Sequence, residues 1–133
     1  MIPMSSSVLR IDVGAIARNT RLLKEQLLQT RLVCVVKADA YNHGADQVVP
    51  VMDEAGADAF GVATFDEAKQ VRALTEKPVL AWLWEPGEDI PEGVELGVPG
   101  LEHLEWLIGH NVRAPLHIVV DTGMNRSGID EED

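Results

Sequence analysis

Short apolar segments recur along this chain, and stretches with helical spacing of apolar residues lie between them. The apolar segments are residues 32–37, 58–63, 78–84, 94–98 and 116–121. Segments of this length and composition are typical of buried β-strands. Strands that alternate with helices pair in parallel, because each helix returns the chain to the same end of the sheet through a right-handed crossover. The sequence therefore predicts an α/β fold of parallel βα units with about five strands.

Helical periodicity is found in four stretches, which are residues 14–30, 45–55, 64–74 and 101–108. Thr64 and Glu67 have the spacing of a capping box, which indicates that the third helix begins there. The pattern places Phe65, Ala68 and Val71 on its inner face. The fourth helix carries an apolar stripe that is expected to face the sheet, formed by Leu101, Leu104, Leu107 and Ile108.

The first thirteen residues have a weaker pattern. Residues 1–7 are polar and rich in serine, which is typical of a terminal tail. Val8–Val13 alternates apolar and polar side chains and predicts a short strand, although no pairing partner is evident. Residues 1–13 are therefore expected to be tail or strand that precedes the first βα unit.

Two architectures satisfy a parallel βα pattern. An open doubly wound sheet completes its core with about five strands, whereas an eight-stranded βα barrel usually takes about 250 residues. The length of 133 residues favours the open sheet when the residues alone are considered. Both architectures place the functional groups at the carboxyl ends of the strands.

Charge excludes several classes of partner. The chain has 22 acidic and 11 basic residues, which gives a formal net charge of −11. This charge would repel the phosphates of nucleic acids and the headgroups of anionic lipids. No apolar run approaches the roughly 20 residues that span a bilayer. We expect neither a nucleic-acid nor a membrane partner.

Cysteine and histidine usage gives no sign of a disulfide or of a metal. The single cysteine, Cys34, lies within an apolar segment and has no partner in the chain. His43, His103, His110 and His117 lack the spacing of metal ligands, so no metal is expected. The opening sequence has no basic region followed by an apolar one, as a secretory signal would. The expected location is the cytoplasm.

Lys37 closes the first apolar segment, where a cation is unusual. At the carboxyl end of a parallel strand its amine would lie at the mouth of a pocket. Partial desolvation and nearby positive charge lower the pKa of a lysine and favour Schiff-base formation with an aldehyde. The alternative is a lysine at the rim whose amine simply extends into water. Spacing alone favours the lysine at the rim, because a single lysine after a strand is a weak signal of function.

Three stretches together resemble a known family. They are VKADAYNHG, AGADAFGVATFDEA and VDTGMNRSGI, and they follow the order and the approximate separations of the N-terminal part of the alanine racemases. This family uses pyridoxal 5'-phosphate (PLP) on fold type III. The resemblance implies that residues 1–133 are the N-terminal portion of a TIM-type PLP-binding barrel. Three further strands and the C-terminal β domain would be absent from this sequence.

The resemblance also implies roles for three residues. Lys37 matches the lysine that binds PLP covalently and then acts as the catalytic base for the D-enantiomer. Tyr41 matches the tyrosine that donates a hydrogen bond to the cofactor phosphate. Arg126 matches the arginine near the phenolic oxygen of the cofactor and the substrate carboxylate, where a planar set of donors binds well.

This chain departs from the family pattern at two positions. Asn42 stands where many members have glycine, and asparagine tolerates the left-handed backbone region better than most residues do. Val119 stands where the family often has a lysine, carbamylated in some members, that orients the arginine. The orientation of Arg126 is therefore expected to depend on another group.

The leading hypothesis is an enzyme that interconverts L-alanine and D-alanine and so supplies D-alanine for peptidoglycan. The family's second catalytic base is a tyrosine of the partner subunit, so the complete enzyme is expected to be a homodimer. Because the only tyrosine here is Tyr41, this fragment alone is expected to be inactive. Two alternatives stay open, a non-catalytic PLP-binding barrel module and a receiver-like open sheet. The receiver-like sheet would need an acidic cluster where only Asp39 is found.

Overall fold

The computed structural model describes residues 7–130 and 132, and its centre is one parallel sheet. The predicted strands are all present, although most are shorter than the apolar segments. They are β1 (Val33–Val35), β2 (Ala59–Val62), β3 (Val79–Ala81), β4 (Val94–Val98) and β5 (Leu116–Ile118). Every neighbouring pair is parallel, which confirms the predicted α/β class.

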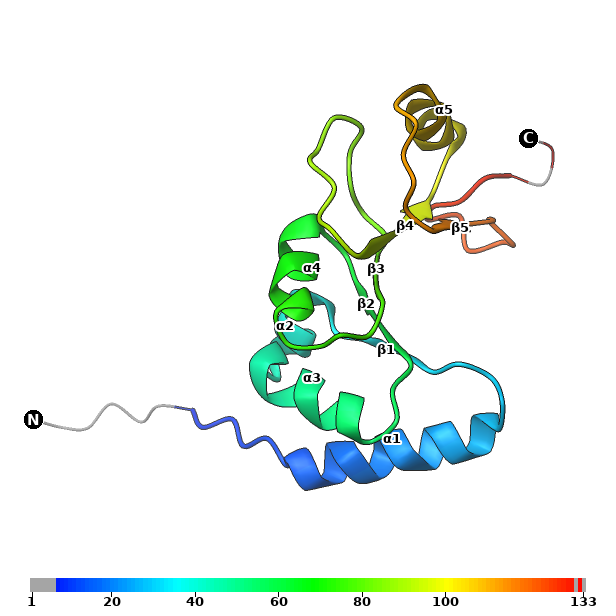
Figure 1. The fold of residues 1–133 in the computed structure, drawn as a ribbon. Coiled ribbons are helices and arrows are strands. Elements are labelled where there is room, and N and C mark those ends of the chain that lie inside the picture. Colours follow the sequence, from blue (N-terminus) through cyan, green and yellow to red (C-terminus); the bar gives the residue numbers. More distant parts are fainter. Residues whose placement is uncertain (1–6, 131, 133) are drawn as a thin grey trace, which may run out of the picture.

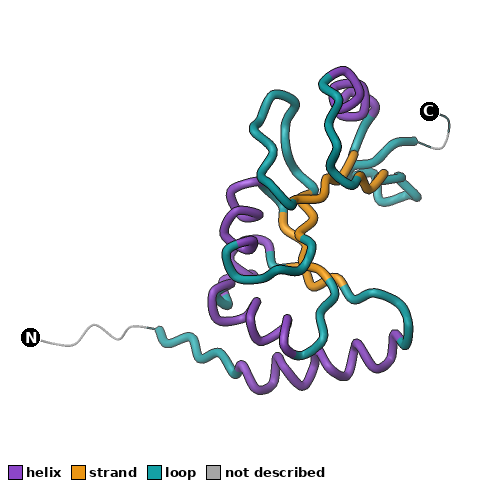
Figure 2. The backbone as a smooth tube through the Cα atoms, in the orientation of Figure 1, coloured by secondary structure: helices purple, strands orange, loops and turns teal. Residues whose placement is uncertain are grey.

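Strand order decides between the two architectures. The strands lie in the sheet in the order in which they occur in the sequence, from β1 to β5. A doubly wound sheet reverses its order at a switch point, whereas a βα barrel adds each strand beside the previous one. The open doubly wound alternative is therefore wrong, and the sheet is an unclosed part of a barrel. Figures 1 and 2 show the strands as a continuous curved series with β1 and β5 at its two ends.

Four helices follow the predicted pattern. They are α1 (Val13–Leu27), α3 (Ala45–Glu54), α4 (Phe65–Arg72) and α5 (Leu101–Gly109). The strand predicted for Val8–Val13 is wrong, because residues 7–12 form no regular element and Val13 begins α1. The carboxylate of Asp12 accepts a hydrogen bond from the N–H of Ala15 at 2.9 Å, so this segment caps a helix instead. Residues 1–6 lie outside the described residues.

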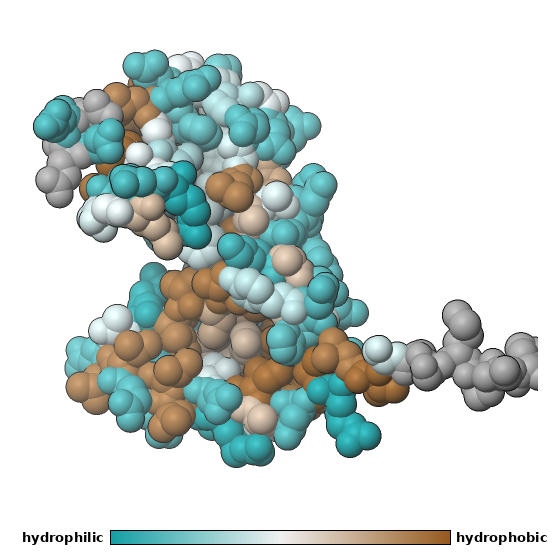
Figure 3. All heavy atoms as spheres, turned by 180° about the vertical axis from the view of Figure 1, so that it is seen from behind, coloured by the Kyte–Doolittle hydropathy of each residue, from teal (hydrophilic) through white to brown (hydrophobic). Residues whose placement is uncertain are grey.

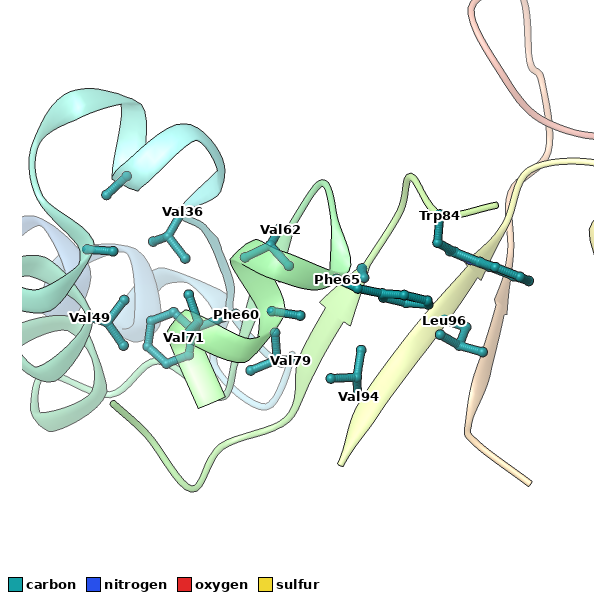
Figure 4. Close-up of a cluster of buried hydrophobic side chains, with 14 of the residues drawn as sticks. Val36, Val49, Phe60, Val62, Phe65, Val71, Val79, Trp84, Val94 and Leu96 are labelled. Atoms are coloured by element: carbon teal, nitrogen blue, oxygen red, sulfur yellow. The ribbon is translucent and has the colours of Figure 1, made fainter. Parts of the chain in front are cut away.

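The hydrophobic core lies between the sheet and the helices α3 and α4. Phe65, Ala68 and Val71 are buried, which confirms the predicted inner face of α4. Figure 4 shows side chains of the strands, of α3 and of α4 gathered in one cluster; its labelled members include Val36, Val49, Phe60, Val62, Val79 and Leu96. Burial of each large side chain stabilises the fold by roughly 1.5–3 kcal/mol. This core fixes the positions of the strand ends at which the site is built.

The first strand is less buried than its apolar sequence predicted. Val33 and Val35 of β1 are 41% and 40% exposed, because β1 is an edge strand in this sheet. Ile118 of β5, the other edge strand, is 52% exposed. Figure 3 shows a broad apolar area on the face seen from behind.

No helix within the described residues is both long and apolar enough to cross a membrane.

The predicted stripe of α5 is only partly correct. Leu107 is buried, but Leu101 and Ile108 are exposed. Leu104 is partly buried and packs against the core beside Leu107. α5 also makes aromatic contacts with Trp84, whose ring centroid lies 4.9 Å from that of His103 and 5.9 Å from that of Trp106. The inner face of α5 therefore combines two of its leucines with these rings.

Candidate active site

Lys37 lies two residues beyond the end of β1, at the carboxyl edge of the sheet. The buried Val36 precedes it and donates its N–H to the carbonyl of Gly61 in β2 at 2.8 Å. Lys37 itself is half-buried and lines a pocket of about 240 Å³. The other residues that line this pocket are Ala63, Trp82, Leu83, Arg126 and Ser127. The structure thus brings Lys37 and Arg126 to one pocket from opposite ends of the sheet.

The segment after Lys37 is a left-handed turn. The short element α2 (Lys37–Asn42) has φ values between 51° and 66° from Ala38 to Asn42. Asn42 was expected to tolerate this conformation, but the four preceding residues share it and none of them is glycine. Each L-residue in this region costs about 1–2 kcal/mol. The surrounding structure must therefore stabilise the turn strongly.

Hydrogen bonds hold both ends of this turn. Within it, the N–H of Ala40 donates to the carbonyl of Val36 at 3.0 Å. At its far end, the carboxylate of Asp39 accepts the N–H of Ala45 at 2.8 Å and so caps α3. The imidazole Nδ1 of His43 lies 2.9 Å from the carbonyl oxygen of Ala40, and it donates there because a carbonyl can only accept. The turn is joined in this way to the core and to α3.

Tyr41 lies beside Lys37 but does not line the pocket that Lys37 shares with Arg126. The Nζ atom of Lys37 is 5.9 Å from the centroid of the Tyr41 ring. The side chain of Tyr41 is 56% exposed and borders a neighbouring, mainly apolar pocket. The ring of Tyr41 is therefore exposed beside the Lys37 amine and outside the pocket that Lys37 shares with Arg126.

Glu67 connects the loops that follow β1 and β2. Its Oε1 accepts the N–H of Ala38 at 3.0 Å, and its Oε2 accepts the N–H groups of Ala63 at 2.7 Å and of Thr64 at 3.2 Å. The N–H of Glu67 in turn donates to the hydroxyl of Thr64 at 3.3 Å, which confirms the predicted capping box. The capping pattern identified Glu67, but nothing in the sequence indicated its contact with Ala38.

Trp82 forms the apolar wall of the pocket and was missed by the sequence analysis. Its indole lies over Gly61 of β2 and Gly97 of β4, where a Cβ on either glycine would come within about 3 Å of it. The N–H of Trp82 donates to the carbonyl of Val62 at 3.1 Å, so the residue continues the pairing of β3 with β2. Gly61 and Gly97 lie in the strands on either side of Trp82, and glycines in neighbouring strands leave room for a large side chain between them. This pattern in the sequence could have indicated the position of the indole.

Arg126 belongs to a loop that folds around Asp121. The Oδ1 atom of Asp121 accepts the N–H groups of Gly123 at 2.9 Å and of Asn125 at 3.1 Å. These bonds hold the pKa of the Asp121 carboxyl below its ordinary value. The N–H of Asp121 also donates to the carbonyl of Ile129 at 3.0 Å, which closes the loop.

Val119, in place of the family lysine, contributes no charged group to the pocket. Its N–H donates to the carbonyl of Val98 at 3.0 Å and extends the pairing of β5 with β4. The loop that carries Arg126 is therefore ordered by backbone bonds and by Asp121.

The pocket presents two cationic groups, the amine of Lys37 and the guanidinium of Arg126. Within residues 7–130 and 132, neither Lys37 nor Arg126 forms a salt bridge. An amine and a guanidinium beside the flat indole of Trp82 suit a planar ligand that carries an aldehyde and anionic groups. The chemistry of these donors therefore fits PLP.

Comparisons with known proteins give a consistent result. The model of the family "Alanine racemase, N-terminal domain" matches residues 11–133. The alanine racemase of Corynebacterium efficiens is 46% identical over 134 residues, which cover 93% of this chain and 36% of that protein.

Solved structures agree with the sequence comparisons. The alanine racemase of Corynebacterium glutamicum is similar with a TM-score of 0.87 and 43% identity, covering 92% of this chain and 38% of the other. The alanine racemase of Bartonella henselae, solved with covalently bound pyridoxal phosphate, has a TM-score of 0.82 and 31% identity, also covering 92% and 38%. The chain spans little more than a third of the length of these relatives.

Proposed function

This chain belongs to the alanine racemase family, and we propose that residues 1–133 form the N-terminal part of a PLP-binding barrel that interconverts L-alanine and D-alanine. The observation that carries the proposal is the meeting of Lys37, Trp82 and Arg126 at one pocket. These residues follow β1, β3 and β5, so only a correctly ordered sheet brings them together.

We propose that Lys37 binds PLP covalently and moves the proton of the substrate Cα on one face. When bound, PLP withdraws electrons from that carbon and makes its proton acidic. A half-buried amine that forms no ion pair within the described residues is suited to proton transfer. The indole of Trp82 would exclude water from one side of the reacting centre.

Arg126 and Tyr41 are proposed to bind the anionic groups. The guanidinium of Arg126 lines the same pocket as the Lys37 amine, where it would orient the substrate carboxylate and the phenolic oxygen of PLP. The hydroxyl of Tyr41, whose ring lies beside Lys37, would donate to the cofactor phosphate. Both roles rest on the position of each side chain relative to the Lys37 amine.

We propose alanine as the substrate because the Corynebacterium efficiens protein, 46% identical to this chain, is named for it. Racemisation needs a proton donor or acceptor on each face of a planar carbon. The only tyrosine of this chain, Tyr41, lies on the Lys37 side. The second base would then come from a partner subunit in a homodimer. The complete enzyme would act in the cytoplasm and supply D-alanine for peptidoglycan.

The same shortage of bases favours one alternative, a PLP-binding module without catalysis. Such a module would bind PLP at Lys37 and would leave the configuration of alanine unchanged. Binding of the cofactor therefore tests the site, and turnover in a complete enzyme tests the reaction.

The test of the site is borohydride reduction of the full chain after exposure to PLP, followed by peptide mapping. We expect the label on Lys37, and we expect Lys37→Ala to lose it. Lys69, an exposed lysine paired with Asp66 at 3.4 Å, is the internal reference, together with Lys24 and Lys77. Equal labelling of these lysines and of Lys37 would contradict the proposed attachment site.

A further inference from the structure

We propose that Glu67 is a positioning residue for Lys37, which it holds at the pocket through the backbone of Ala38. This inference rests on the proposed role of Lys37 in binding PLP. Glu67 does not line the pocket, and within the described residues it forms no salt bridge with Lys37; it acts on the peptide that follows Lys37.

The carboxylate of Glu67 gathers three backbone donors from two loops. Ala38 follows Lys37 after β1, whereas Ala63 and Thr64 follow β2. A half-buried carboxylate with two oxygens can accept all three N–H groups at once. Because Lys37 and Ala63 line the same pocket, Glu67 fixes the distance between two of its walls.

Helix capping accounts for only part of this arrangement. A capping box requires the bonds between Thr64 and Glu67, which are local to α4. The bond from Ala38 to Oε1 joins residues 29 positions apart and adds nothing to the cap. It fastens instead the first residue of the left-handed turn, whose φ is 51°.

The left-handed turn explains why this contact matters for Lys37. Residues forced into a sparsely populated backbone region return to a common one when their restraints are removed. Ala38 is exposed, so side-chain packing restrains it little at the end next to Lys37. On its amino side Lys37 is held by Val36, which is buried and donates its N–H to Gly61. On its carboxyl side the Oε1 contact is the nearest hydrogen bond, and its loss would let the peptide between Lys37 and Ala38 rotate and turn the amine away from Arg126.

Two variants separate positioning from capping. Glu67→Gln preserves a residue that serves in capping boxes, but its amide has one accepting oxygen in place of two. Because the Oε2 position accepts two N–H groups and the Oε1 position only one, we expect the amide oxygen to take the Oε2 position and the NH₂ group to face the N–H of Ala38 and repel it. Thr64→Ala is the matched control, because it removes the hydroxyl of the cap and leaves the Ala38 contact in place.

The first readout is amide hydrogen exchange at Ala38 and Ala63, measured by NMR on the full chain without cofactor. In Glu67→Gln we expect exchange at Ala38 to rise by about tenfold, the scale of losing a bond to a charged acceptor, and exchange at Ala63 to change much less. In Thr64→Ala both rates should stay near those of the wild type. Unchanged exchange in Glu67→Gln would overturn the inference.

The second readout is the initial rate of PLP trapping on Lys37 by borohydride, relative to Lys69. We expect this ratio to fall several-fold in Glu67→Gln and to stay unchanged in Thr64→Ala. An equal fall in both variants would show that Glu67 acts only as a helix cap and would overturn the inference. If the wild type showed no preference for labelling Lys37 over Lys69, the proposed function would be contradicted. Amide exchange at Ala38 would still report whether the bond from Ala38 to Glu67 holds the left-handed turn.

Discussion

The Nζ atom of Lys24 lies 2.6 Å from Oδ2 of Asp58, and this ion pair joins α1 to the residue that precedes β2. The same oxygen accepts the N–H of Leu32 at 2.6 Å, just before β1. The bond from Lys24, and then that from Leu32, hold the pKa of Asp58 below its ordinary value of 3.8. One carboxylate therefore fastens α1 and the first two strands at the amino ends of the strands.

This relationship predicts an acid-dependent loss of stability. The pKa of Asp58 is lower in the folded than in the unfolded chain, so its contribution is complete above about pH 5 and is lost as pH falls through the folded pKa. Asp58→Asn should lower the free energy of unfolding by about 1 kcal/mol at pH 7. Urea denaturation should show this difference shrink below pH 4.

The control for the acid prediction is Asp66→Asn. Asp66 pairs with Lys69 at 3.4 Å, but its side chain is 95% exposed, so its effect should be small at every pH. A pH-independent difference between Asp58→Asn and the wild type would contradict the assignment of acid sensitivity to Asp58.

Gly61→Ala should destabilise the chain through Trp82. The new Cβ would lie 2.6 Å from Cζ3 of the indole, so the ring must move from its place over β2. Overpacking of this kind costs about 1–3 kcal/mol. Thermal unfolding measures the effect, and the double variant Gly61→Ala/Trp82→Leu should recover most of the loss.

Gly109→Ala serves as the control for Gly61→Ala. A Cβ at Gly109 meets nothing within 4 Å, and alanine is the better helix former at the end of α5. It should leave stability unchanged or raise it. Equal destabilisation by both substitutions would show that the contact with Trp82 is not the cause.

Arg126→Lys is expected to affect substrate handling more than cofactor capture in a complete enzyme. Lysine retains the positive charge but loses the planar set of donors, so turnover should fall by about tenfold or more while PLP occupancy stays near that of the wild type. Cofactor absorbance and steady-state kinetics measure the two effects separately.

The control for Arg126→Lys is Arg113→Lys. Arg113 precedes β5 and so lies at the amino ends of the strands, whereas the pocket lies at their carboxyl ends. The enzyme should tolerate this change. Loss of PLP from Arg126→Lys with normal turnover per bound PLP would instead make Arg126 a cofactor anchor.

A polypeptide of these 133 residues alone should not racemise alanine at an enzymatic rate. In the part of the chain that the structure describes, β1 and β5 are the two edge strands of an unclosed sheet, so we expect low stability or self-association. With Lys37 as the only proposed base, a proton can leave and return on one face of the substrate carbon only.

The chain should therefore exchange the α-hydrogen of one enantiomer with deuterium far faster than it inverts that enantiomer. Mass spectrometry and chiral chromatography of alanine incubated with the chain and PLP measure the two rates. Formation of D-alanine from L-alanine well above the rate with free PLP would contradict this prediction.

The sequence by itself determined the βα pattern and the elements that lie next to the site. Apolar periodicity located all five strands, and the Thr64 and Glu67 pair located the start of α4. These features depend on contacts within a few residues or on the partition of apolar side chains, so they can be read along the chain. The placement of Lys37 just after the first strand follows from the same pattern.

Tertiary structure decided what meets at the pocket. The sequence placed Lys37 and Arg126 after strands and therefore at the same edge of the sheet, and their shared pocket agrees with that expectation. The position of Trp82 over two glycines and the second contact of Glu67 depend on strand order and register. The left-handed turn after Lys37 also escaped prediction, because local preference disfavours it and only surrounding contacts stabilise it. Local preferences act over a few residues, whereas these contacts join residues up to 29 positions apart, which only the folded sheet brings together.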